Sequence, residues 1–133
     1  MTTLRSYSHN VSGEREFGFA QAIKVAETIY VSGQLSHDDE GNFLHANDFN
    51  AQIKQTFANL DKVLGHFRVT RKQIVQDTVF VVNLREHNNA VAAAHLEYFG
   101  EHRPTSTTVG AEALFFPGQL IEINVIIRTD LDA

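Results

Sequence analysis

The chain has 133 residues, of which 43% are hydrophobic and 20% charged, as expected for a single globular domain spanning residues 1–133. It contains no cysteine, which excludes disulfides and thiolate chemistry, and its formal net charge of −5 argues against binding to a nucleic-acid backbone. No apolar segment approaches the roughly 20 residues of a membrane span. Residues 1–5 lack an apolar signal core, so we expect a cytoplasmic protein without membrane contact.

The first third of the sequence predicts an N-terminal arm, a hairpin and a charged loop. Residues 1–16 are weakly patterned and suit an edge strand or a loose arm. Residues 21–25 and 28–32 alternate around a two-residue connection, which predicts a β-hairpin. Residues 37–42 hold three carboxylates and a histidine, but their spacing does not match a calcium loop. We therefore expect a solvated turn there rather than a metal site.

A clear helical pattern follows. Its apolar residues recur every three or four positions and are Phe49, Ile53, Phe57, Leu60, Leu64 and Phe67. Asp48 suits the N-cap, and Gly65 suits the position after the helix. The polar face is expected to contact solvent, and its members are Gln52, Gln55, Asn59 and Lys62. A helix with one apolar stripe needs a sheet to pack on.

The next segment predicts an interior strand and a second helix. Thr70 and Gln73 match a capping box that starts one helical turn. Residues 76–82 end in an apolar run that is typical of a strand inside a sheet. A helix is expected to begin at residue 88 or 89 and to end before Gly100. Its buried stripe comprises Val91, Ala94 and Tyr98.

The last third predicts two strands around a turn at residues 116–119. Residues 105–109 are rich in β-branched and hydroxyl side chains, which favour a strand. The strand over residues 120–127 has one wholly apolar face, made of Ile121, Ile123, Val125 and Ile127. Its other face carries Glu122, and a carboxylate is costly to bury there without a partner. Glu122 is therefore the best functional clue in the sequence.

Together these elements predict an α+β fold, in which a mixed β-sheet carries two helices packed on one face. The opposite face of such a sheet would be left bare. Because a monomer rarely exposes a large apolar face, we expect an oligomer to cover it.

Four motifs give the sequence a resemblance to a known family. Residues 31–34 (Val-Ser-Gly-Gln), 80–84, 103–106 and 120–123 resemble the Rid (YjgF-type) family of reactive-intermediate deaminases in order and spacing, from about residue 19 to residue 127. The resemblance implies a homotrimer, similar to a chorismate-mutase-like barrel, with ligand clefts between subunits. It also implies hydrolysis of enamines and imines to keto acids and ammonia, without a cofactor or a metal.

The resemblance also implies which residues form the site. The carboxylate that assists water falls on Glu122, and the residues that contact substrate fall on Phe19, Ser32, Gly33, Ser106, Thr107 and Thr108. Ser106 stands where the family has an arginine that pairs with the substrate carboxylate. A serine cannot replace a bidentate guanidinium, so we expect little activity on α-imino acids.

Each of these residues also has an ordinary structural interpretation. Glu122 would be either a cleft carboxylate or a half-buried residue paired with a base at an oligomer interface. The hydroxyl residues would be either ligand donors or ordinary strand residues, with Ser106 and Thr108 on one face and Thr107 on the other. Arg103 and His95 are expected on the surface, although either would reach a cleft from its position.

Three functions remain open on the sequence alone. The first is an imine or enamine deaminase, and the second is a non-catalytic small-molecule binder on the same scaffold. The third is a ribonuclease or translation inhibitor, which the acidic charge makes the weakest.

Overall fold

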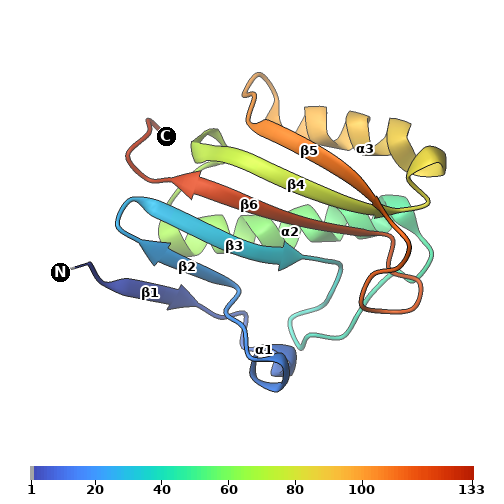
Figure 1. Cartoon of the computed structure of the whole chain (residues 1–133), viewed down its shortest axis with the longest axis horizontal. Helices are drawn as coiled ribbons and strands as arrows, with labels where there is room; N and C mark the ends of the chain where they lie inside the picture. The colour runs from blue at the N-terminus through green and yellow to red at the C-terminus, as the bar shows by residue number, and fades with distance from the viewer. Residues whose placement is uncertain (1) are drawn as a thin grey trace.

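A six-stranded mixed sheet with helices behind it dominates the computed structural model, which describes residues 2–133 (Figure 1). The strand order across the sheet is β1-β2-β3-β6-β4-β5. The strands are β1 (Leu4–Tyr7), β2 (Ala22–Val25), β3 (Thr28–Gln34), β4 (Ile74–Val82), β5 (Thr105–Ala111) and β6 (Ile121–Arg128). The helices are α1 (Ser12–Phe17), α2 (Phe49–Phe67) and α3 (Leu84–Phe99), with a 3₁₀ turn at Arg71–Gln73.

The predicted fold class is confirmed. Neighbouring strands run antiparallel except β4 and β5, which are parallel and joined through α3. The two long helices, α2 and α3, cover the same face of the sheet (Figure 1). The apolar stripe of β6 is fully buried against them, as are Ile29 and Val81 from neighbouring strands. No helix within residues 2–133 is long and apolar enough to cross a membrane.

Both predicted turns are present. Val25 pairs with Thr28, so Ala26 and Glu27 form the two-residue turn of the β2–β3 hairpin. Between β5 and β6, the Gln119 amide donates to the Phe116 carbonyl at 2.9 Å. Gly118 has a φ of 81° there, a conformation that residues with a side chain rarely adopt.

The N-terminal arm is more ordered than the sequence suggested. The edge-strand expectation is confirmed for β1, but helix α1 was not predicted; Met1 lies outside the described residues. The Glu14 carboxylate accepts hydrogen bonds from the His9 amide at 2.8 Å and from the Ser8 hydroxyl. These contacts hold α1 against the C-terminal end of β1, and α1 lies near the C-terminal end of β3 as well (Figure 1).

Two expectations for α2 are wrong, while its cap is confirmed. The Asp48 carboxylate accepts from the Ala51 amide at 3.2 Å. Gly65 does not end the helix, which continues to Phe67 and closes at Arg68 in a left-handed conformation with φ of 56°. Gln52 and Asn59 are buried rather than solvent-exposed.

The buried polar side chains of α2 hold two loops in place. Gln52 Nε2 donates to the His45 and Gly118 carbonyls, each at 2.8 Å, and its Oε1 accepts from the Leu120 amide at 2.8 Å. Asn59 Nδ2 donates to the Leu35 carbonyl at 2.8 Å. Loop backbone therefore compensates these polar groups, and the two loops are fixed where they meet the site described below.

The second helix starts earlier than expected. Helix α3 begins at Leu84, because Asn83 adopts a φ of 55° and turns the chain directly out of β4. The predicted end at Gly100 and the burial of Val91 and Tyr98 are confirmed. The capping box between Thr70 and Gln73 is also present.

Candidate functional site

Glu122 lies on the face of the sheet that the helices leave open. It pairs with Phe80 on β4, which pairs in turn with Val109 on β5, and the three side chains form one row across that face. Its neighbours Ile121 and Ile123 point the other way and are buried beneath the helices. The prediction that Glu122 points away from the subunit core is confirmed.

A glycine in the neighbouring strand makes room for this carboxyl group. The pairing of β3 with β6 is interrupted by an irregularity between Val31 and Gln34, which contains Ser32 and Gly33. A Cβ atom on Gly33 would lie 2.6 Å from Glu122 Cδ and 2.6 Å from Oε2. Glycine is therefore the residue that lets the carboxyl group lie against the strand.

Glu122 is half-buried and almost without partners. Burial raises its pKa above the ordinary glutamate range, while Gln119 Nε2, at 3.5 Å from Oε1, opposes the rise only weakly. Within residues 2–133, no lysine or arginine forms a salt bridge with it. A carboxyl group with a raised pKa and free oxygens is suited to exchanging protons with a bound molecule.

Four of the seven predicted site residues line one cavity of about 430 Å³, namely Phe19, Ser32, Gly33 and Glu122. The Ser32 hydroxyl donates to the Ala20 carbonyl at 2.6 Å, so only its lone pairs face a ligand. The remaining walls are largely aromatic, with Phe17, Phe115 and Phe116 prominent among them. The cavity thus combines one carboxyl group with walls that are mostly apolar and that include the polar side chains of Gln21 and His37.

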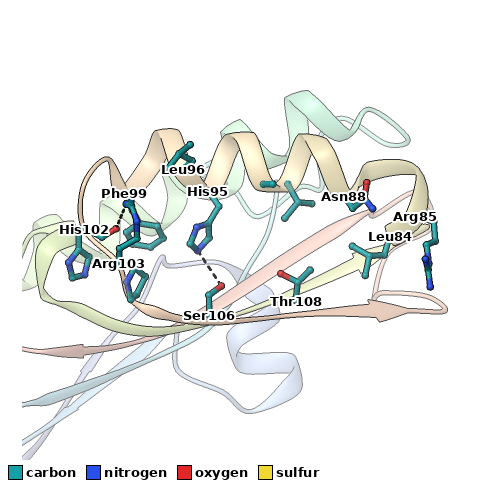
Figure 2. A pocket seen from close by; sticks show the side chains of 13 residues that line it. Leu84, Arg85, Asn88, His95, Leu96, Phe99, His102, Arg103, Ser106 and Thr108 are labelled. Atoms are coloured by element: carbon teal, nitrogen blue, oxygen red, sulfur yellow. Dashed lines mark hydrogen bonds between the residues drawn. The ribbon is translucent and has the colours of Figure 1, made fainter.

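The other predicted residues do not join this cavity within one chain. Ser106 and Thr108 face the helices and line a second cavity of about 600 Å³ between α3 and β5 (Figure 2). Thr107 points to the open face in a row with Thr78 and Asn124. The predicted alternation of β5 is confirmed. It places Ser106 and Thr108 on the opposite side of the sheet from Glu122, so a single chain does not assemble all seven residues.

Beneath the second cavity lies a cluster that the sequence analysis missed. Asp77, only 1% exposed, accepts from the Ser106 hydroxyl at 2.5 Å, and its second oxygen lies 2.6 Å from His95 Nε2. His95 Nε2 also lies 3.3 Å from Ser106 Oγ (Figure 2). The expectation that His95 sits simply on the helix surface is wrong, because its ring turns inward to meet a buried carboxylate.

This cluster is not arranged for nucleophilic catalysis. A serine nucleophile needs a base that takes its proton, while the acid holds the other ring nitrogen. Here a single histidine nitrogen meets both partners, and Ser106 donates directly to Asp77. The geometry instead satisfies a buried charge.

The sequence positions of Asp77 and His95 indicate that each side chain faces the core. Asp77 stands two residues before Val79, which places it on the buried face of β4. His95 stands four residues after Val91, which places it on the buried stripe of α3. The register between β4 and β5 brings Asp77 to Ser106, and the packing of α3 on the sheet brings His95 to Asp77.

The rim of the second cavity is basic, and one of its two arginines, Arg103, is held by backbone carbonyls. Arg85, Arg103 and His102 line it together with His95. Arg103 is exposed, as expected, and donates to the Gly100 and His102 carbonyls at 2.5 and 3.0 Å. No grouping of three or more His, Asp and Glu side chains suited to a metal ion occurs in the described part of the chain.

Fold and site together define the class of protein. The chain matches the family described as Endoribonuclease L-PSP over residues 13–129, and it belongs to this family, the Rid (YjgF-type) proteins. It is 31% identical over 108 residues to a RutC family protein of Sulfurisphaera tokodaii, covering 81% of this chain and 85% of that protein.

Two further comparisons agree. The chain is 27% identical over 108 residues to the 2-iminobutanoate/2-iminopropanoate deaminase of Homo sapiens, covering 81% and 77% of the two chains. The crystal structure of the Rid-family protein YyfA from Yersinia pestis superposes with a TM-score of 0.83 at 29% identity, over 95% of this chain and 99% of that one.

Proposed function

We propose that the protein hydrolyses a small imine or enamine, with Glu122 as the group that handles the protons of the attacking water. The reaction adds water to a C=N bond and releases a carbonyl compound and ammonia. The supporting observation is the Glu122 carboxyl group, half-buried over Gly33 with one weak amide partner, in a cavity whose walls are mostly apolar. The name of the human relative, an imine deaminase, supports the same chemistry.

The carboxyl group suits both halves of this reaction. Ionised, it accepts a proton from water as the water oxygen bonds to the imine carbon. Protonated, it donates that proton to the imine nitrogen, which gives a carbinolamine. A second transfer, of the carbinolamine hydroxyl proton to the amino group, releases ammonia as the C–N bond breaks and the carbonyl forms. Burial raises the pKa of Glu122 above the ordinary glutamate range, which makes its protonated form easier to reach than that of an exposed glutamate.

We further propose that the complete site lies between subunits of a homotrimer. The open face carries half-exposed Tyr30 beside Ile126, and Phe80 beside Val109, and these apolar side chains suit contact with a partner chain. The polar row that contains Thr107 lies between them. The Glu122 cavity of one chain and the Ser106–Thr108 cavity of its neighbour would then face one small-molecule ligand.

The position of Ser106 supports a ligand without a carboxylate. Its hydroxyl is already committed to Asp77 at 2.5 Å, so it offers no donor to a substrate anion. A carboxylate placed in a partly dry cleft without a cation is destabilised by several kcal/mol. We therefore propose that α-imino acids are poor substrates.

A non-catalytic binder is the alternative that Ser106 favours, because this serine stands where the family has an arginine and its hydroxyl is held by Asp77. A ribonuclease would need clustered basic charge, whereas the chain carries 11 basic and 16 acidic residues. We also propose a cytoplasmic location.

The test is ammonia release from freshly generated imines, with and without a carboxylate. We expect turnover of at least one carboxylate-free imine, reduced about a hundredfold or more by Glu122→Gln. Glu97→Gln, on an exposed part of α3, serves as the control and should keep full activity. Ligand-dependent thermal shifts without turnover would support the binder instead.

A further inference from the structure

Three aromatic rings in contact with one another line the cavity beside Glu122, and a fourth, Phe43, stacks on one of them. The Phe17 and Phe115 rings meet edge to face with centroids 4.9 Å apart, and Phe115 meets Phe116 at 4.9 Å. Phe116 stacks on Phe43 with centroids 5.2 Å apart and an interplanar angle of 3°. The rings come from α1, the β5–β6 loop and the β3–α2 loop, so three separate segments converge on one cavity.

The outer pair is exposed to a degree that is costly for phenylalanine. Phe17 is 59% exposed and Phe115 is 62% exposed. Both line the cavity that Glu122 closes. An apolar group seated between them would remove ring surface from water.

Two hydrogen-bond donors in the cavity wall are already occupied within the chain. The Ser32 hydroxyl donates to Ala20, and His37 Nδ1 donates to the Asp38 carbonyl at 2.7 Å. Ionised Glu122 is the principal free group, and it only accepts. A ligand head placed there therefore presents N–H or O–H donors.

We infer that the preferred substrate of this site is an aryl or similarly bulky apolar imine that lacks a carboxylate, with its body held between Phe17 and Phe115 and its N–H directed at Glu122. This inference rests on the proposed function for the identity of the reactive group. It adds Phe17 and Phe115 as the residues that determine specificity. A cavity of about 430 Å³ is of ligand size and exceeds what a three-carbon imine fills.

Benzamidine, acetamidine and benzoate separate the contributions to binding. The first pairs an aryl body with N–H donors, the second keeps only the donors, and the third keeps only the body and adds an anion. Calorimetry should show benzamidine binding at least about tenfold more tightly than either of the others. Equal binding of benzamidine and acetamidine would overturn the inference.

Substitutions test whether Phe17 and Phe115 cause the preference for benzamidine over acetamidine. Phe115→Ala, and Phe17→Leu as a second variant that is milder toward folding, should reduce the benzamidine-to-acetamidine ratio to below about threefold. Leu4→Ala removes an equally exposed apolar side chain (59%) on β1 and should leave the ratio unchanged. An unchanged ratio in both phenylalanine variants would contradict the assignment. So would a loss of oligomer in light scattering of Phe115→Ala, because the pair would then be a contact between chains.

Turnover distinguishes this inference from the proposed function. Imines generated from benzylamine and ethylamine should differ in kcat/KM in favour of the aryl compound, and Phe115→Ala should close the gap. Glu122→Gln should lower both rates without changing their ratio. Equal kcat/KM values for the two imines in the wild type would refute the specificity alone. Full activity in Glu122→Gln would refute the proposed chemistry.

Discussion

Two carboxylates in neighbouring strands of the same sheet differ in the face they occupy, in burial and in hydrogen-bond partners. Asp77 on β4 faces the helices, is fully buried, and is held by Ser106 and His95 at 2.5 and 2.6 Å. Glu122 on β6 faces the open side, is half-buried, and has one amide partner at 3.5 Å. The contrast shows that the partners of a strand carboxylate, more than its burial, decide whether it is available for chemistry.

Breaking the Asp77 cluster should have the largest effect. His95→Ala leaves a buried carboxylate with one neutral donor, and we expect a loss of about 3 kcal/mol in the free energy of unfolding. Urea denaturation measures this loss. The double variant Asp77→Asn/His95→Gln should lose less than the sum of its two single variants, because each removes the same interaction.

The matching change at Glu122 should leave stability almost untouched. Glu122→Gln is expected within about 0.5 kcal/mol of the wild type, since no strong partner is lost. A loss comparable to that of His95→Ala would mean that both carboxylates are structural, and the contrast would fail.

Displacing the Glu122 carboxyl group should lower turnover without unfolding the chain. In Gly33→Ala the new methyl group would overlap Glu122 Cδ at 2.6 Å, so the carboxyl must move, and we expect about a hundredfold lower kcat/KM. Gly110→Ala is the matched control on β5, where the added Cβ meets Leu84 at an ordinary 3.6 Å. Equal activities of the two variants would contradict a role for Glu122 placement.

Restoring the family's arginine tests the second cavity. Ser106→Arg alone should raise 2-iminopropanoate turnover little, because Asp77 is positioned to pair with the new guanidinium. Ser106→Arg/Asp77→Asn removes that competing charge and should gain about tenfold or more. A full gain from the single variant, measured by keto-acid formation, would show that Asp77 does not control this position.

The smallest expected effect is the pH dependence of stability that His9 contributes from the N-terminal arm. Burial lowers the pKa of His9 below its ordinary value, while the hydrogen bond to Gln34, at 2.8 Å, and Glu14 oppose the shift, and His37 and Lys62 add to it. The folded state therefore binds a proton less readily than the unfolded chain. The stability that neutral His9 contributes is complete above about pH 6.5 and is lost as pH falls toward the folded pKa. The melting temperature should fall more steeply between pH 7 and 5 in the wild type than in His9→Gln.

Much of the fold could be predicted because its determinants are local. The spacing of Phe49, Ile53 and Phe57 defines α2, and the β-branched alternation of residues 121–127 defines β6. Helix α1 has six residues and depends on Glu14 contacting the end of β1, so no local period marks it. The burial of Gln52 was missed because two of its three partners, the Gly118 carbonyl and the Leu120 amide, are distant in sequence.

The candidate site, like the fold, could be predicted only where single residues or short motifs define it. Glu122 and Gly33 stood out as a charge in an apolar strand and as a family motif, and they lie together in the structure. The Asp77–His95 pair required the register of β4 against β5 and the rotation of α3, which are tertiary properties. The rim formed by Phe17 and Phe115 likewise joins segments nearly a hundred residues apart.

The most direct test of the proposed site is complementation between two inactive chains. Glu122→Gln removes the carboxyl group, and Thr108→Phe fills the cavity between α3 and β5. If each cleft joins these two faces from neighbouring subunits, hybrids made by mixing the unfolded variants equally and refolding them contain intact clefts at about one interface in four. We predict that the hybrids recover about a quarter of wild-type ammonia release while each parent stays inactive. Activity no greater than the average of the parents would contradict a site shared between chains.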